Sequence, residues 1–390
     1  MNSIWPKAKL SEVAPSKPLK VKNTDAKVWQ LNLNHIESNT GRLIHADIQP
    51  YSEAGTSTHW FDERHVLYSK LRPYLNKVLL PDQKGLATTE LVPMLPNKEL
   101  LNRKYLAFYL RSKQFVDWVS AQTAGAKMPR VSMKVFWDHE IPLPPLAEQQ
   151  KIAAILDAAD QLRQKDQQLV EHYTALGQSL FLEMFGDPLS NPKGWILTEF
   201  GCIFNSIKYG VSTPPKYSTS GIPFIRATNI KKGSVVTKGM VYISLDESKK
   251  ITKCKLSEGD LIIVRSGANT GDCGRIPSEY VDAFGGFDMI IDIDDPYSTF
   301  YNFLLNTGAG KAILKPLTRR AGQPHLNSKQ ISSLSLIAPP VSLQNQFVEH
   351  LQVIETQKQQ AQAALDKSET LFNSLLQRAF KGELTQSTTV

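Results

Sequence analysis

The sequence has few cysteines and no long apolar run, and both absences narrow the class of protein. Its three cysteines, Cys202, Cys254 and Cys273, are odd in number and include no CxxC pair, which argues against a disulfide framework or a zinc finger. No apolar stretch is long enough for a membrane span, and the first residues, MNSIWPKAKL, lack the apolar core of a signal peptide. We therefore expect a cytoplasmic protein that does not contact the membrane.

Catalytic and cofactor-binding motifs are also missing. Adenine methylation needs an Asn/Asp-Pro-Pro-aromatic loop, and neither TPPKY at 213–217 nor DPY at 295–297 fits that pattern. The segment TGAGKA at 307–312 lacks the first glycine and the final Ser/Thr of a phosphate-binding loop. The eight histidines show no metal-ligand spacing with Cys or carboxylates. We expect a chain that is not an enzyme and that binds no metal or cofactor itself.

The positive charge becomes informative when it is divided along the chain. The net charge of +8 comes from segments 1–143 and 187–338, which carry +7 and +5, whereas segments 144–186 and 339–390 carry −3 and −1. The two basic segments mix short β-rich runs with turn residues and short helical patterns, which is typical of compact α+β domains of ordinary size. Two basic domains are the electrostatic outline of a protein that binds a polyanion at two places.

The other two segments have the pattern of long helices. Each begins after a proline pair and ends before a glycine, as helices commonly do. Apolar residues recur in them at three- and four-residue steps, which predicts a narrow coiled-coil seam. In the first helix the seam consists of Ile152, Ile155, Ala159, Leu162, Leu169, Tyr173, Leu176 and Leu180. In the second it consists of Phe347, Leu351, Ile354, Ala361, Leu365, Phe372, Leu375 and Ala379.

The chain is built twice. The proline pairs at 144–145 and 339–340 lie 195 residues apart, which is half of the 390 residues. At the same offset the helices match at several identical positions, and DERHVLYSK at 62–70 lies over SEGDLIIVR at 257–265. If the two helices pair antiparallel, a pseudo-two-fold axis relates the copies and inverts the domains. Two DNA-binding domains related by a two-fold axis are suited to two half-sites on one DNA duplex. Because the two domains differ in sequence, we expect a bipartite, non-palindromic DNA target.

These features resemble the specificity subunit of type I restriction–modification systems. The likeness covers essentially the whole chain and is carried by IPLPPLAEQQKIAAILDAADQLRQKDQQL at 141–169, its degenerate copy APPVSLQNQFVEHL at 338–351, and the target-recognition-like segments GIPFIRATNIKKG and LSEGDLIIVRSGANTG. It implies an α+β fold with two small mixed target recognition domains, 1–143 and 187–338, in inverted orientation. Two long antiparallel coiled-coil helices, within 144–186 and 339–390, would separate them.

The resemblance also implies a division of labour between this chain and its partners. Each domain would read one half of a double-stranded DNA site, and the helices would act as a spacer and dock two modification subunits. Those subunits would bind S-adenosylmethionine and methylate adenine at N6, and a restriction subunit would bring ATP and Mg. Contact with the modification subunits would fall at the helix starts. The residues concerned are Pro144, Pro145, Glu148, Gln149, Pro339, Pro340 and Gln344.

Base reading needs Arg, Lys, Asn, Gln, Ser or Thr on loops that can reach a groove, with further basic residues on phosphates. In the first domain these candidates are Lys70, Arg72, Tyr74, Asn76, Lys77, Lys127 and Arg130, with Arg42 as a weaker choice. In the second they are Arg226, Thr228, Asn229, Arg265, Ser266, Asn269, Thr270, Arg319, Arg320, Gln323 and His325, with Lys231 and Lys232 on phosphates. The duplication favours Lys70 and Arg265, because it places both directly after a strand.

Two other functions fit the same residues. A stand-alone or orphan DNA-binding regulator would bind a split site without partners. A coiled-coil scaffold would bind proteins through its domains, and its positive charge would be incidental.

Overall fold

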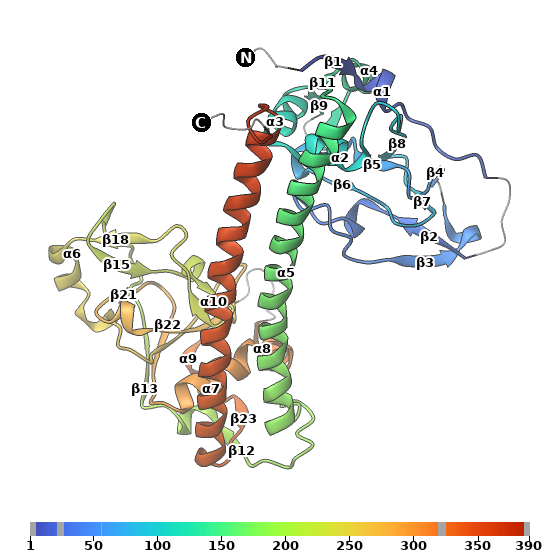
Figure 1. Ribbon diagram of the computed structural model, residues 1–390. Helices are drawn as coiled ribbons and strands as arrows, with labels where there is room; N and C mark the ends of the chain where they lie inside the picture. Colours follow the sequence, from blue (N-terminus) through green and yellow to red (C-terminus); the bar gives the residue numbers. More distant parts are fainter. Residues whose placement is uncertain (1–4, 22–26, 56, 126, 319–324, 386–390) are drawn as a thin grey trace. The chain divides into compact units, whose positions relative to one another are not determined.

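The computed structural model describes residues 5–21, 27–55, 57–125, 127–318 and 325–385. The chain forms two compact units, one made of residues 1–168 and 361–390 and the other of residues 169–360. Two long helices, α5 (Leu146–Phe185) and α10 (Val341–Ala379), each give one half to each unit (Figure 1). The two long helices expected from the sequence are confirmed.

The first unit contains two sheets and a group of short helices. One sheet has the order β3-β2-β7-β4 and the other β6-β5-β8, while β1 pairs with β11 and β9 with β10. The strands are β1 (Lys7–Lys9), β2 (Lys27–Leu31), β3 (Asp47–Pro50), β4 (His59–Phe61), β5 (Val66–Ser69), β6 (Val78–Leu79), β7 (Gly85–Ala87), β8 (Leu91–Met94), β9 (Thr123–Ala124), β10 (Arg130–Val131) and β11 (Glu140–Pro142). The helices are α1 (Leu10–Val13), α2 (Arg103–Arg111), α3 (Lys113–Ala121) and α4 (Met133–Trp137).

The second unit has the same kind of composition. Its two four-stranded sheets have the orders β13-β22-β19-β20 and β14-β18-β15-β21, and β12 pairs with β23 and β16 with β17. The strands are β12 (Leu197–Glu199), β13 (Ser206–Tyr209), β14 (Tyr217–Ser218), β15 (Ile222–Ile225), β16 (Ile230–Lys231), β17 (Ser234–Val235), β18 (Val241–Ile243), β19 (Leu261–Ile263), β20 (Cys273–Arg275), β21 (Phe284–Gly285), β22 (Met289–Asp292) and β23 (Ser335–Ile337). The helices are α6 (Leu245–Lys250), α7 (Tyr297–Asn306), α8 (Gly308–Thr318) and α9 (Ser328–Ser332).

The internal repeat is confirmed by the order and the spacing of these elements. Helices α3 and α8 begin at 113 and 308, α4 and α9 at 133 and 328, and α5 and α10 at 146 and 341, so each pair is 195 residues apart. The central strands β5 and β19 follow the same offset. Equivalent backbone hydrogen bonds accompany them, since Val131 N–H donates to the Lys70 carbonyl over 3.1 Å and Leu326 N–H to the Arg265 carbonyl over 2.8 Å.

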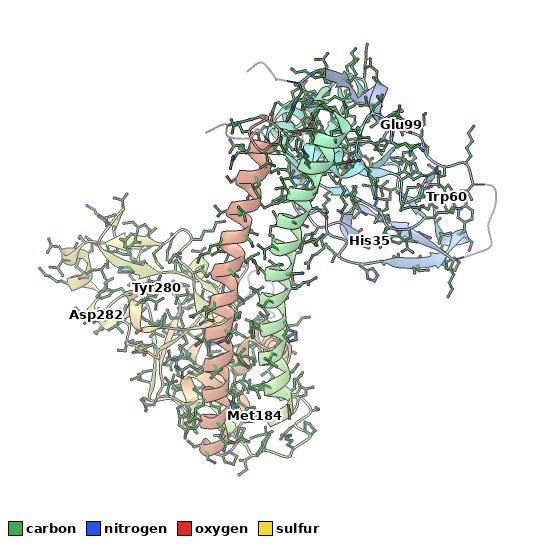
Figure 2. All side chains as sticks on the ribbon, in the orientation of Figure 1. His35, Trp60, Glu99, Met184, Tyr280 and Asp282 are labelled. Carbon is green, nitrogen blue, oxygen red and sulfur yellow. The ribbon has the colours of Figure 1, made fainter. Side chains whose placement is uncertain are left out.

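The two long helices pair antiparallel in both units. In the first unit, Ile152 from the start of α5 shares a core with Phe372 and Leu376 from the end of α10. In the second, Phe181 from the end of α5 shares a core with Phe347 from the start of α10. Met184 packs against the edge of that second core (Figure 2). Each unit therefore buries its half of the helix pair against its own globular part.

The predicted seam is correct for α10 but wrong for one side of α5. Its members on α10 are buried or half-buried, whereas Ile155, Leu162, Leu169 and Leu176 of α5 are 38 to 46% exposed. Helix α5 carries two neighbouring apolar rows, and the row that includes Leu156 faces the core instead. Periodicity alone cannot choose between two adjacent rows, because either satisfies the heptad spacing.

Candidate nucleic-acid interface

In the second unit, two loops expected to read DNA lie against each other. The first follows β15 and begins with Arg226, and the second follows β19 and includes Arg265, two residues after the strand ends. The amide Nδ2 of Asn269 donates to the Ala227 carbonyl over 3.5 Å and joins the two loops. They border a cleft of about 270 Å³ lined by Arg226, Ser266 and the rings of Tyr217, Phe224 and Phe287, among others. Basic, hydroxyl and aromatic groups thus gather at one surface site.

Arg265 is held between two aromatic rings. Its guanidinium carbon lies 4.4 Å from the ring centre of Tyr209 and 4.3 Å from that of Phe287. Its Nη2 lies 3.1 Å from Nε2 of His325, and the backbone at Ser266 forms a β-bridge with His325. The Tyr209 hydroxyl donates to Oγ of Ser328 over 3.1 Å, which ties this ring to the start of α9. Contacts with both rings and with His325 therefore restrict the orientation of this arginine.

A buried acid lies beneath this arginine. Asp288 is 4% exposed, and its Oδ1 accepts the backbone N–H of Arg265 over 3.1 Å. Burial raises the pKa of Asp288 to about 6, because the bond from Arg265 N–H and the nearby guanidinium only partly offset the effect of burial. The carboxylate fixes the backbone of the loop and is almost fully buried, although Asp288 is among the residues that line the cleft.

The other candidate DNA-binding residues of the second unit lie on or near the same two loops. Arg226 stacks on Tyr217 at 5.5 Å and donates from Nη2 to the Gly239 carbonyl over 2.6 Å. Some of the remaining candidate side chains are exposed, and others form hydrogen bonds with nearby backbone. Thr228, Lys231 and Lys232 are exposed, whereas the Thr270 hydroxyl donates to the Gly267 carbonyl. Three further candidates, Arg319, Arg320 and Gln323, lie outside the described residues.

Two asparagines predicted to read bases are buried, and for them the prediction is wrong. Asn229 is fully buried; its Oδ1 accepts the Arg226 N–H, and its Nδ2 donates to the Val236 carbonyl over 3.1 Å. Asn76 is 9% exposed, adopts a positive φ of 49°, and donates to the Arg111 carbonyl over 3.2 Å. Both amides shape turns, a role that asparagine fills well because it bonds to nearby backbone.

The first unit brings its own candidates together around the end of β5. The backbone N–H of Arg72 donates to the Pro129 carbonyl over 2.7 Å, and its Nη2 lies 3.4 Å from the Lys127 carbonyl. Arg72, Tyr74 and Lys127 are exposed, and Lys70 is half-buried. These residues form a basic surface patch at the position equivalent to the Arg265 loop.

Three basic residues of the first unit are already engaged within the fold. Arg130 forms an ion pair with Glu90 at 2.9 Å, and Arg42 forms one with Glu37 at 3.1 Å. The Nζ of Lys77 donates to the Leu33 carbonyl over 2.6 Å, and burial lowers its pKa. A DNA phosphate would have to compete with these partners.

The starts of the long helices are anchored by two equivalent glutamines, which were expected to dock partners. Gln149 and Gln344 are buried, and each donates from Nε2 to a carbonyl five residues earlier, that of Pro144 or Pro339, over 2.8 Å. Gln149 also accepts the Asn102 N–H over 2.8 Å. The docking prediction is therefore wrong for both glutamines, which hold the helix starts to the domains.

The remaining positions at the helix starts differ in accessibility. Pro145 and Pro340 are exposed, whereas Pro144 and Pro339 are buried. Glu148 is half-buried and accepts a hydrogen bond from the Thr385 hydroxyl.

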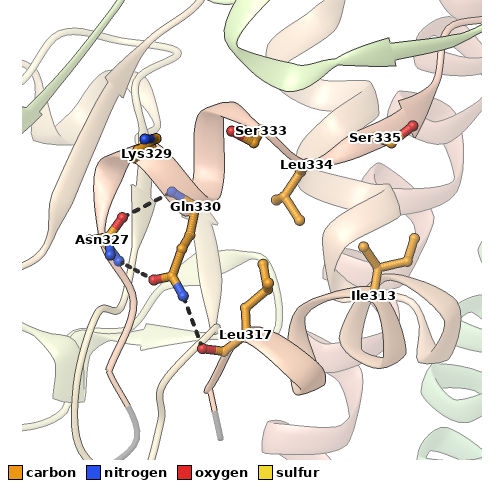
Figure 3. Close-up of a pocket in the computed structure, with 8 residues that line it drawn as sticks. All are labelled: Ile313, Leu317, Asn327, Lys329, Gln330, Ser333, Leu334 and Ser335. Carbon is orange, nitrogen blue, oxygen red and sulfur yellow. Dashed lines mark hydrogen bonds between the residues drawn. The ribbon is translucent and has the colours of Figure 1, made fainter. Parts of the chain in front are cut away.

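The second unit has another cleft, whose polar residues bind groups of the protein itself. It measures about 400 Å³ and lies between α8 and α9 (Figure 3). Asn327 and Gln330 bond each other's backbone N–H groups over 3.0 and 2.9 Å, and Gln330 Nε2 lies 3.3 Å from the Leu317 carbonyl. These amides cap the start of α9, and their hydrogen bonds are directed at the protein itself.

Sequence reasoning missed the residues that hold the candidate arginines. Tyr209, Phe287 and Asp288 come from β13 and from the turn before β22, at least 22 positions from Arg265 along the chain. No local motif marks them, since only the order of strands in the sheet brings them to Arg265. Glu90, which precedes β8, was missed for the same reason.

Comparison with known proteins decides the family. Residues 4–172 and 192–367 match the family described as "Type I restriction modification DNA specificity domain". The chain belongs to this family. As a type I specificity protein it determines the DNA target of a restriction–modification system and is a non-catalytic subunit. Within the described ranges, no group of His, Cys, Asp and Glu could hold a metal ion, and no helix could cross a membrane.

Curated relatives agree with this family, and a solved structure matches the fold. The type I specificity chain is 26% identical over 311 residues to the StySPI specificity subunit of Salmonella potsdam, covering 74% of this chain and 67% of the relative. It is 25% identical over 313 residues to the EcoKI specificity subunit of Escherichia coli K12, with the same coverage. The S subunit from M. genitalium matches its fold with a TM-score of 0.61 at 14% identity, over 97% of this chain and 96% of that one.

Proposed function

We propose that each globular part of this specificity subunit reads one half of a bipartite, asymmetric DNA site. The observation that carries the proposal is the equivalence of Lys70 and Arg265, which follow the central strands β5 and β19 at the 195-residue offset. The same place in the two copies thus presents different chemistry to DNA. Phosphate contacts would come from the excess positive charge of both parts, +7 and +5.

The proposal includes two modification subunits bound to the long helices. An exposed apolar row on α5 supports this, with Ile155 and Leu162 in the first unit and Leu169 and Leu176 in the second. Exposed apolar surface at regular helical spacing is typical of a docking face. The partners would bind S-adenosylmethionine and methylate adenine at N6, and a restriction subunit would bring ATP and Mg. The complex would act in the cytoplasm.

The test maps methylated adenines in a host without adenine methylation of its own. Cells carrying this chain and its modification subunit should gain N6-methyladenine within one split sequence whose two halves differ and are separated by a fixed spacer. A methylation pattern identical to that of cells with the modification subunit alone would contradict the proposal. Binding to a split site without any partner would favour a stand-alone regulator, and DNA affinity independent of salt would favour a protein scaffold.

A further inference from the structure

Arg265 differs from Arg275, which ends a neighbouring strand of the same sheet, in what balances its charge. Arg275 of the same sheet pairs with the carboxylate of Asp295. In the part of the chain that the structure describes, no carboxylate side chain forms an ion pair with Arg265. Two rings flank it instead, and both Tyr209 and Phe287 remain 41% exposed. The nearest acid, Asp288, is buried and accepts the backbone N–H of Arg265. A half-buried guanidinium beside exposed rings that is not ion-paired to a carboxylate keeps hydrogen-bonding capacity for a ligand.

The aromatic clamp also decides which donors of Arg265 a ligand can reach. Its Nε is buried and has no hydrogen-bond partner within the described part of the chain. A ligand would therefore bind Nη1 and the second hydrogen of Nη2, because Nη2 also lies 3.1 Å from Nε2 of His325. Because the clamp fixes the plane of the guanidinium before DNA arrives, little side-chain entropy is lost on binding.

We infer that Arg265 reads a guanine in the major groove, with Tyr209 and Phe287 as the positioning residues that orient it. This inference rests on the proposed function, in which the second globular part reads one half-site. Guanine offers two acceptors, O6 and N7, to a pair of parallel N–H donors. Adenine, cytosine and thymine place an amino or methyl group there, so a guanidinium held in one plane discriminates against them.

The first repeat lacks this clamp and supplies the contrast. Leu67 of β5 pairs with Pro93 of β8, and the equivalent Ile262 of β19 pairs with Ile290 of β22. Glu90 and Phe287 each lie three residues before these partners, so Glu90 occupies the position that Phe287 has in the second repeat. Glu90 binds Arg130, and Lys70 takes the place of Arg265. The ammonium of a lysine is a point charge without a fixed plane. We therefore expect clamped guanine reading in the second half-site only.

The test compares methylation of a plasmid library in which every base pair of the second half-site is varied. The full chain is used in complex with its modification subunit, as wild type and as Arg265→Ala, Arg265→Lys, Tyr209→Leu, Phe287→Leu and Tyr209→Phe. In the wild type, one G·C pair should be preferred over the other pairs by roughly 10- to 100-fold. That preference should fall at least about tenfold in the first four variants and persist in Tyr209→Phe, which keeps the ring.

Two results would overturn the inference. The first is an unchanged preference in Arg265→Ala and Arg265→Lys. The second is a uniform loss of affinity for all sequences, with the salt slope reduced by about one, which is the signature of a phosphate contact. Failure of the proposed function looks different, because the wild-type complex would then methylate no split site. Arg265→Lys keeps the positive charge at a half-buried position. It therefore tests guanine recognition even if Arg265→Ala, Tyr209→Leu or Phe287→Leu unfolds the domain.

Discussion

Replacing Asp160 by alanine should destabilise the first unit by about 3–5 kcal/mol, the cost of breaking a buried ion pair from one side. Asp160 is 6% exposed, and its carboxylate binds Arg111 of α2 at 3.1 Å and Arg163 of α5 at 2.5 Å. Both guanidiniums also lie over the ring of Phe372 from α10. Without the carboxylate, two buried cations would face each other inside the unit. Urea unfolding of the full chain measures the loss.

The control for this prediction is Asp157→Ala, one turn earlier on the same helix. Asp157 binds Lys104 at 2.8 Å in an exposed ion pair, and such pairs contribute about 0–1 kcal/mol. Burial alone would raise the pKa of Asp160, but Arg111 and Arg163 outweigh it and lower the pKa. A lowered carboxyl pKa means that its stabilisation is present at neutral pH and is lost as the pH falls through the folded-state pKa. Equal losses in the two variants at pH 7 would refute the prediction.

This buried triad belongs to one repeat only. At the 195-residue offset, Asn306 replaces Arg111, while Glu355 and Lys358 replace Asp160 and Arg163 and form a partly exposed ion pair at 3.2 Å. In the second unit, Phe181 of α5 instead packs against Phe300, Phe303 and Phe347 at centroid distances of 5.3 to 5.7 Å. The repeat has kept its element order while the two domains came to be attached to the helices by different chemistry.

Replacing Leu162 by glutamate should weaken docking of the modification subunit by about 30-fold or more, the effect expected for an interface residue worth about 2 kcal/mol. Leu162 is 46% exposed on α5, so the substitution leaves the core of the first unit intact. It places a charge in the middle of an apolar contact, where burial without a partner is costly. Calorimetry of the full chain with its modification subunit measures the affinity.

The matched control for the docking prediction is Gln357→Glu on α10. Gln357 occupies the equivalent position 195 residues later, is exposed, and is already polar. We expect this variant to bind the modification subunit with nearly wild-type affinity. Wild-type affinity in both variants would remove α5 as the docking helix, and an equal loss in both would show that the effect is not specific to its apolar row.

Local patterns and the internal repeat were sufficient to predict much of the fold from the sequence. The proline pairs and apolar spacing located both helices, and the 195-residue offset placed Lys70 and Arg265 at equivalent strand ends. These patterns could not predict which apolar row of α5 faces inward, because that depends on the globular part packed against it. Nor could they predict that Asn229 is buried or that Tyr209 clamps Arg265, because both follow from tertiary contacts between distant segments.

The most direct test of the account compares methylation maps of Arg265→Ala and Lys70→Ala in the full chain with its modification subunit. The central claim is that one globular part reads each half-site. Arg265→Ala should therefore relax the sequence requirement in one half-site and preserve the other, and Lys70→Ala should do the reverse. Relaxation of both half-sites by either substitution, or of the same half-site by both, would contradict the claim.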